Sequence, residues 1–310
     1  MKRQSVTTMS ANEQLSPSHN VLLAETDQHL AVQNTSTASM TMSTRVASRW
    51  SARLVGFLVS LLFLVLINYA HFGVLLRYFW PAKPPVNRKK CTCECWDTIF
   101  KGTYETGVGR YKHMYFNVTP QTLKMWTLTV AAVLLTYECI TYVIRVALRS
   151  KIRPSMFVLL LAVIHSHYYS WWVFIGYYND DFYSQWWHQL VFTSSELMST
   201  VLVLKQLDQA VALSPRLLLA TAGIAAFHVL AAGKDQFVHN VLLRRGEFHQ
   251  VYRDSALMVS DVVYLVVTSA ELVRMWCCER RSRDDVRMFG RDVLFCLVVI
   301  FGLIAMLSYL

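Results

Sequence analysis

Apolar residues gather into seven long runs between Leu54 and the last residue, Leu310, with polar and basic residues between the runs. Each run approaches the roughly 20 apolar residues that a helix needs to cross the hydrocarbon core of a bilayer. The pattern therefore predicts an all-α membrane protein, a polytopic bundle of about seven transmembrane helices. The predicted spans are Leu54–Leu76, Leu123–Ile144, Met156–Tyr177, Trp187–Leu204, Leu217–Gly233, Ala256–Arg274 and Val293–Leu310.

The first fifty residues have a different composition from the rest of the chain. They are rich in Ser, Thr, Gln, Asn and Ala, contain one proline, Pro17, and have no aromatic residue before Trp50. Such a segment buries too little apolar surface to offset the entropy lost on ordering. We predict a disordered cytosolic tail over residues 1–53 and a transmembrane helical domain over residues 54–310.

The distribution of Lys and Arg predicts the orientation. The short connections on one side carry twelve basic residues, and those on the other side carry four. Short loops rich in Lys and Arg stay in the cytosol. We therefore expect a cytosolic N-terminus and, with seven crossings, a C-terminus outside. The net charge of +10 belongs to these loops and helix ends, which favours a lipid bilayer, and not nucleic acid, as the partner.

The long connection over residues 77–122 is predicted to be an ordered outer loop. Asn117-Val118-Thr119 is an N-glycosylation triplet, which predicts a glycoprotein of the plasma membrane or of the endomembranes of the secretory pathway. Three cysteines in this loop, Cys91, Cys93 and Cys95, fit a disulfide with one thiol left over, inert thiols, or a metal site. The C-x-C spacing is tight for two ligands on one zinc ion. Two further cysteines, Cys277 and Cys278, lie at the predicted inner membrane edge beside basic residues, as palmitoylated cysteines do.

Three predicted helices carry a glutamate that follows small hydroxyl residues. These are Glu138 in the second span, Glu196 after Thr193-Ser194-Ser195 in the fourth, and Glu271 after Thr268-Ser269-Ala270 in the sixth. A carboxylate at membrane depth costs a few kcal/mol unless it is paired, protonated or hydrated. We expect these side chains to face the interior of the bundle together with Asp261. They would serve either as a path for a solute or proton, or as hydrogen-bonding contacts between helices.

Histidines and aromatic residues support other interpretations. An intramembrane metal-dependent lipid hydrolase could use ligands drawn from His165 or His167, His228, His239 and Asp261. His165 and His167, however, are two residues apart and point about 200° around a helix, so both cannot face one site. The chain also contains no H-E-x-x-H or G-x-S-x-G motif. Aromatic residues crowd the segment from Tyr168 to Trp187, as in an interfacial belt or a lipid-binding pocket.

Small residues fill the fifth span from Ala220 to Gly233, which predicts a helix packed centrally among the others. The sequence as a whole predicts a non-enzymatic membrane protein without a cofactor. It would act in solute or ion transport, or as a receptor or accessory protein for a small solute, ion or lipid ligand, through an interior lined by Glu138, Glu196, Asp261 and Glu271. The metal-dependent hydrolase is the alternative.

Overall fold

A computed structural model describes residues 50–75, 98–101, 110–113, 120–180, 183, 185–246, 248–278 and 283–308. Residues 54–310 form one compact unit. Residues 1–49 of the predicted disordered tail, Asn117, and the cysteines at positions 91, 93 and 95 lie outside the described residues, whereas residues 50–53 of that tail begin the first helix.

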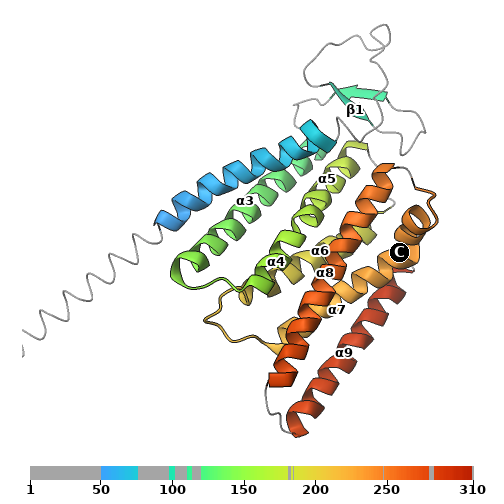
Figure 1. The fold of residues 1–310 in the computed structure, drawn as a ribbon. Helices are drawn as coiled ribbons and strands as arrows, with labels where there is room; N and C mark the ends of the chain where they lie inside the picture. The colour runs from blue at the N-terminus through green and yellow to red at the C-terminus, as the bar shows by residue number, and fades with distance from the viewer. Residues whose placement is uncertain are drawn as a thin grey trace, which may run out of the picture. The chain divides into compact units, whose positions relative to one another are not determined.

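Helices make up almost all of the described chain, as predicted (Figure 1). The first helix covers residues 50–68 and continues as the π-helix η1, Tyr69–Leu75. It is followed by α3 (Pro120–Arg149), α4 (Pro154–Ala162), α5 (Ile164–Asp180) and α6 (Trp186–Lys205), then by α7 (Pro215–Ala232) with the π-helix η2 (Gly233–Leu242), α8 (Phe248–Cys278) and α9 (Arg283–Leu307). Each of the seven predicted spans thus coincides with helix.

Six of these helical segments are long and apolar enough to cross a membrane. They overlap every predicted span except Trp187–Leu204, which forms α6. The mean hydropathy of α6 is lowered by its polar face, which includes Gln189, Thr193, Glu196 and Thr200. The structure therefore establishes an all-α bundle of membrane-spanning character.

The third predicted span is not one continuous helix. The break between α4 and α5 falls at Val163. The hydroxyl group of Ser260, on α8, donates a hydrogen bond to the carbonyl oxygen of Ala162 at 3.0 Å, beside this break. This contact comes from the sixth predicted span, as does the contact of Asp261 described below.

A two-stranded antiparallel sheet is formed by the two strands among the described residues. Strand β1 (Thr98–Lys101) pairs with β2 (Arg110–His113), with Thr98 opposite His113 and Lys101 opposite Arg110. It lies within the predicted outer loop, 77–122, where the sequence analysis expected order but no strand. Both strands contain aromatic residues, which favour extended structure.

Two connections meet at one end of the bundle. Ile152 and Asp208 form an isolated antiparallel bridge, and the backbone N–H of Arg153 donates to the carbonyl oxygen of Leu207 at 2.8 Å. We call this the bridge end, and the opposite end, where α5 and η2 finish, the cavity end. Because α5 follows the first of these connections and α6 precedes the second, the two helices form an antiparallel hairpin.

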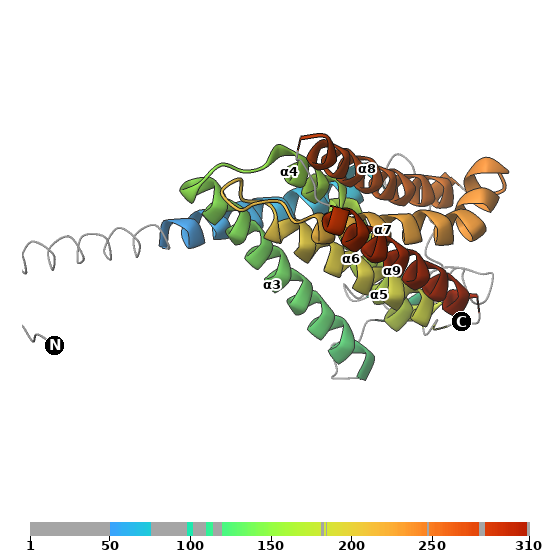
Figure 2. The same ribbon diagram turned by 90° about the horizontal axis from the view of Figure 1, so that it is seen from below.

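Helix α7 is central, as its small residues predicted. It packs against α6, α8 and α9, which lie around it in both views (Figures 1 and 2). Its buried positions include Ala222, Gly223, Ala225 and Ala231. Small side chains allow neighbouring backbones to approach closely, and this supports tight packing where the surrounding lipid offers no hydrophobic driving force.

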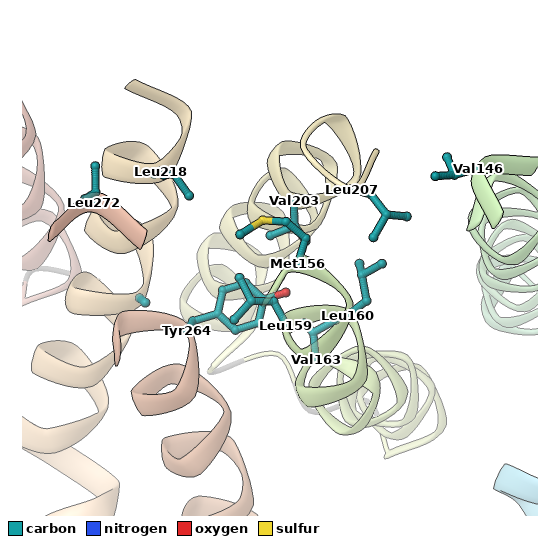
Figure 3. Close-up of a cluster of buried hydrophobic side chains, with 11 residues drawn as sticks. Val146, Met156, Leu159, Leu160, Val163, Val203, Leu207, Leu218, Tyr264 and Leu272 are labelled. Atoms are coloured by element: carbon teal, nitrogen blue, oxygen red, sulfur yellow. The ribbon is translucent and has the colours of Figure 1, made fainter. Parts of the chain in front are cut away.

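A hydrophobic cluster fills the bundle toward the bridge end (Figure 3). Met156, Leu159, Val203, Leu207 and Leu218 are each fully buried in it. These residues come from α4, from α6 and the connection after it, and from α7. We refer to this set, together with Leu160, Val163, Ala225, Tyr264, Leu272 and Val146, as the inner cluster.

Candidate functional site

A cavity of about 760 Å³ lies in the half of the bundle nearer the cavity end. Its wall includes Gln185 and Gln236, which are exposed near that end. Its polar lining includes Glu196 of α6, His228 of α7 and Asp261 of α8. Two of the carboxylates that the sequence predicted to line a polar interior, Glu196 and Asp261, therefore share one cavity.

Both π-helical segments contribute to the cavity wall. Ala70 and His71 come from η1, and Gln236, Phe237 and Asn240 come from η2. A π-helix widens the backbone and turns side chains away from their α-helical directions, and such segments recur at functional sites. The unusual backbone of this protein thus coincides with its cavity.

His228 is held between two side chains from neighbouring helices. Its Nδ1 lies 3.1 Å from Oδ1 of Asp261, and its Nε2 lies 2.7 Å from Oγ of Ser195. The side chain of His228 is 3 % exposed and that of Asp261 is 15 % exposed. An ionised Asp261 accepts the Nδ1–H bond, which fixes the ring and leaves Nε2 to face Ser195.

Glu196 follows Ser195 on α6 and lines the cavity, near the side chain of Ser166 on α5. Among the ion pairs between described residues, none includes Glu196. The imidazole of His228, which Asp261 contacts, interacts electrostatically with Glu196 when it is protonated.

A second polar group lies nearer the mouth of the cavity, around Asp254 of α8. Asn240 donates to Oδ2 of Asp254 at 2.7 Å, and Nε of Arg253 donates to Oδ1 at 2.5 Å. The guanidinium group of Arg253 also donates to Gln236 at 2.7 Å and lies over the ring of Tyr169. Asp254 is therefore neutralised by Arg253, and this group holds η2 against α8.

The other two predicted carboxylates lie elsewhere. Glu138 is exposed on α3. Glu271 pairs with Arg274, one turn further along α8, at 2.9 Å, beyond the inner cluster from the cavity. The similar sequences around Glu196 and Glu271 thus lie at different places in the fold, and only the first contributes to the cavity.

The histidines proposed as alternative metal ligands are also dispersed. His165 lines the cavity, whereas Nε2 of His167 contacts Oγ1 of Thr200 at 2.8 Å, so the two rings face different partners, as their spacing predicted. His239 is exposed and is not part of the cavity wall. In the described part of the chain, no three His, Cys, Asp or Glu side chains come together to hold a metal ion.

Sequence reasoning missed Ser195, Ser166 and Arg253 as members of polar contacts in the bundle. Ser195 could have been noticed because it directly precedes Glu196 within a run of hydroxyl residues. Its pairing with His228 joins residues 33 positions apart in the chain. Cys277 is a free thiol and exposed, and the side chain of Cys278 lies outside the described residues.

The chain belongs to a family of unknown function, DUF8801, whose family model matches residues 53–310. The matched region contains all the residues of the cavity and every helix described above, apart from the first three residues of the first helix. No curated protein and no solved structure matches the chain.

Proposed function

We propose that this membrane protein binds a small solute in the cavity and transports it across the bilayer. The position of Glu196, His228 and Asp261 is the observation that carries this proposal. They line a cavity that reaches exposed residues near the cavity end, and the inner cluster packs the bundle toward the bridge end. Transporters commonly bind substrate near the bilayer midplane and expose the site to one side at a time. A cavity that lies nearer one end of the bundle fits one such state.

The proposal includes seven crossings, with α6 as the fourth. The connection before α4 meets the connection after α6 through the Ile152–Asp208 bridge, so α6 returns across the same depth that α4 and α5 traverse. Its polar face is directed at the bundle, where Ser199 and Thr200 are buried. A polar helix can cross a membrane when its polar face is covered by protein.

The proposed orientation places the bridge end in the cytosol and the cavity end outside, following the basic short loops. Glycosylation tests it in cells. We expect a glycosidase-sensitive mass shift that disappears in Asn117→Gln and persists in Asn34→Gln. A shift that instead depends on Asn34 would invert the orientation.

Cysteine accessibility tests transport without knowledge of the solute. Leu257 lines the cavity one turn before Asp261, and Val203 is fully buried in the inner cluster. Leu257→Cys and Val203→Cys would be labelled with a membrane-impermeant maleimide in sealed vesicles of both orientations, followed by mass spectrometry of the peptide concerned. We expect fast labelling of Leu257→Cys from the cavity end, slower labelling from the bridge end, and protection of Val203→Cys from the cavity end. No labelling of Leu257→Cys from either side would overturn the proposal, and labelling from one side alone would leave a binding protein without transport.

One observation favours a second function, hydrolysis or acyl transfer. Ser195, His228 and Asp261 form the hydrogen-bonded chain that activates a serine nucleophile. This differs from the metal-dependent hydrolase of the sequence analysis because it needs no ion. Ser195 does not line the cavity, however, and its Oγ lies 2.8 Å and 2.9 Å from the carbonyl oxygens of Val191 and Phe192, to which it donates within its own helix. These two facts make transport the better-supported function.

A fluorophosphonate probe distinguishes the two functions directly. A nucleophilic Ser195 would be labelled covalently, and the label would be lost in Ser195→Ala. The transport proposal expects no labelling of Ser195, with Ser194→Ala as the matched control on the same helix turn.

A further inference from the structure

We infer that the solute bound in this cavity is a cation, and that Glu196 is the group that recognises its charge. This inference rests on the proposed function, because it names the class of solute that the same cavity takes. It follows from the charges that line the cavity and from the kind of surface between its mouth and its floor.

The charges at the floor of the cavity do not balance. Glu196 and Asp261 are two carboxylates, and His228 is the one cationic partner near them in the described part of the chain, already held by Asp261 at 3.1 Å. A further carboxylate of the cavity, Asp254, is neutralised by Arg253. When both floor carboxylates are ionised, the floor carries an excess negative charge even with a protonated His228. A buried unpaired charge is unfavourable, so Glu196 requires either a proton or a cation beside it.

The wall between the mouth and Glu196 is suited to a cation. It is lined by aromatic rings from α5, α6 and α8: Tyr168, Trp172, Tyr177, Phe192 and Tyr252. The face of such a ring attracts a cation, more strongly when the cation has lost part of its water. Arg253 already uses this contact at the mouth, with its guanidinium carbon 6.0 Å from the centre of the Tyr169 ring. The cavity volume of about 760 Å³ exceeds what an inorganic ion needs and fits an organic cation.

Two neighbouring carboxylates would not support this inference by themselves, since acidic side chains often lie close together without binding a ligand. Here the carboxylate lies within an aromatic-lined cavity, and among the described residues no Lys or Arg forms an ion pair with Glu196. The nearby hydroxyl group of Ser166 is buried and uncharged, so it does not neutralise the carboxylate. The carboxylate of Glu196 is thus available to bind a positively charged group of the solute.

Charge selectivity can be measured with two thiol reagents of similar size and opposite charge. Leu257→Cys would be reacted with a trimethylammonium-bearing methanethiosulfonate and with its sulfonate-bearing counterpart, in the full chain reconstituted in nanodiscs. The rate would be read by mass spectrometry of the peptide that carries the introduced cysteine. We expect the ratio of the cationic to the anionic reaction rate to be higher for Leu257→Cys than for a free thiol in solution. In Leu257→Cys/Glu196→Gln we expect this preference to fall by about tenfold, as removal of one charge from the same partly hydrated cavity should cause.

The matched control is Leu257→Cys/Glu138→Gln, which removes a carboxylate from the exposed face of α3 and should leave the preference unchanged. Equal rates for the two reagents, or a preference that survives Glu196→Gln, would overturn the inference while leaving the cavity and the proposed function intact. Failure of both reagents to react would instead overturn the proposed function. A thermal unfolding curve for each variant shows whether the substitutions preserve the fold.

Discussion

His228 and Asp261, 33 residues apart on adjacent helices, place Nδ1 and Oδ1 3.1 Å from each other at the floor of the cavity. The contact joins α7 to α8, a pair of helices that pack along each other. It also fixes the ring of His228 so that its other nitrogen faces Ser195 on α6. One imidazole therefore connects three helices, and its protonation state affects all three.

The first prediction concerns Asp261. Asp261→Asn keeps the size of the side chain and one oxygen acceptor. We therefore expect the free energy of unfolding to fall by about 1–3 kcal/mol, the range for weakening a hydrogen bond to a charged group. Asp261→Ala leaves the Nδ1–H group of His228 without a partner, and breaking a buried pair in this way costs roughly 3–5 kcal/mol. In thermal unfolding in detergent, the wild-type protein should have the highest Tm, Asp261→Asn a lower one and Asp261→Ala the lowest. An Asp261→Ala protein as stable as wild type would contradict the pairing.

The second prediction concerns Gly56, in the first helix, where it meets Thr141 of α3. A Cβ atom at Gly56 would lie 2.4 Å from Oγ1 of Thr141 and 3.2 Å from its Cα atom. Because the backbone of α3 cannot rotate away, we expect Gly56→Ala to lower stability by about 1–3 kcal/mol through overpacking, despite the higher helix propensity of alanine.

Gly302 provides the matched control for this substitution. It lies on α9, and a Cβ atom added there would meet no other described atom within 4 Å, so Gly302→Ala should be neutral or slightly stabilising. In the double variant Gly56→Ala/Thr141→Ala, loss of the Thr141 hydroxyl should recover part of the stability. Additive effects of the two substitutions would contradict a direct contact.

The third prediction concerns Arg153 at the bridge end. This buried side chain donates to the carbonyl oxygen of Gln206 and, at 2.7 Å, to that of Val211. Arg153→Met removes both hydrogen-bond donors to the connection between α6 and α7. We expect the free energy of unfolding to fall by about 2–4 kcal/mol and proteolysis between residues 206 and 214 to become faster. Arg149→Met, at an exposed position four residues earlier, is the control and should behave as wild type. Equal proteolysis rates for the two variants would show that Arg153 does not hold this connection.

The fourth prediction is a pH dependence at the same end of the bundle. The pKa of Asp208 is lowered by a hydrogen bond from the side chain of Ser150, then by the backbone N–H of Ala210, and by the charge of Arg153. A lowered pKa in the folded state means that ionised Asp208 stabilises the fold above its unfolded pKa of about 3.9, and that this contribution is lost as the pH falls through the folded value.

Thermal unfolding as a function of pH measures this contribution. At pH 7 we expect a lower Tm for Asp208→Asn than for wild type, and the difference should shrink below about pH 4 as Asp208 becomes protonated in both states of the wild-type protein. A difference that is constant from pH 7 to pH 3 would show that the effect does not come from the charge.

The sequence by itself determined the class of protein and the position of its helices. All seven apolar runs are helical in the described residues, the third of them broken at Val163, because the need to satisfy backbone hydrogen bonds in lipid leaves few alternatives to a helix. It also predicted that small residues would place α7 at the centre, and that Glu196 and Asp261 would face inward, since a carboxylate exposed to lipid is costly. The break at Val163 and the π-helical turns of η1 and η2 had no such signal, because they depend on contacts such as that from Ser260 to Ala162.

Only the tertiary structure decided which polar residues meet. Glu196 and Glu271 follow similar hydroxyl-rich sequences, yet one lies in the cavity and the other pairs with Arg274 beyond the inner cluster. Periodicity reports the face of a helix on which a residue lies, but not the depth or the neighbour that it reaches on another helix. The chain from Ser195 through His228 to Asp261 joins positions on three helices, so it exists only once α6, α7 and α8 have packed together.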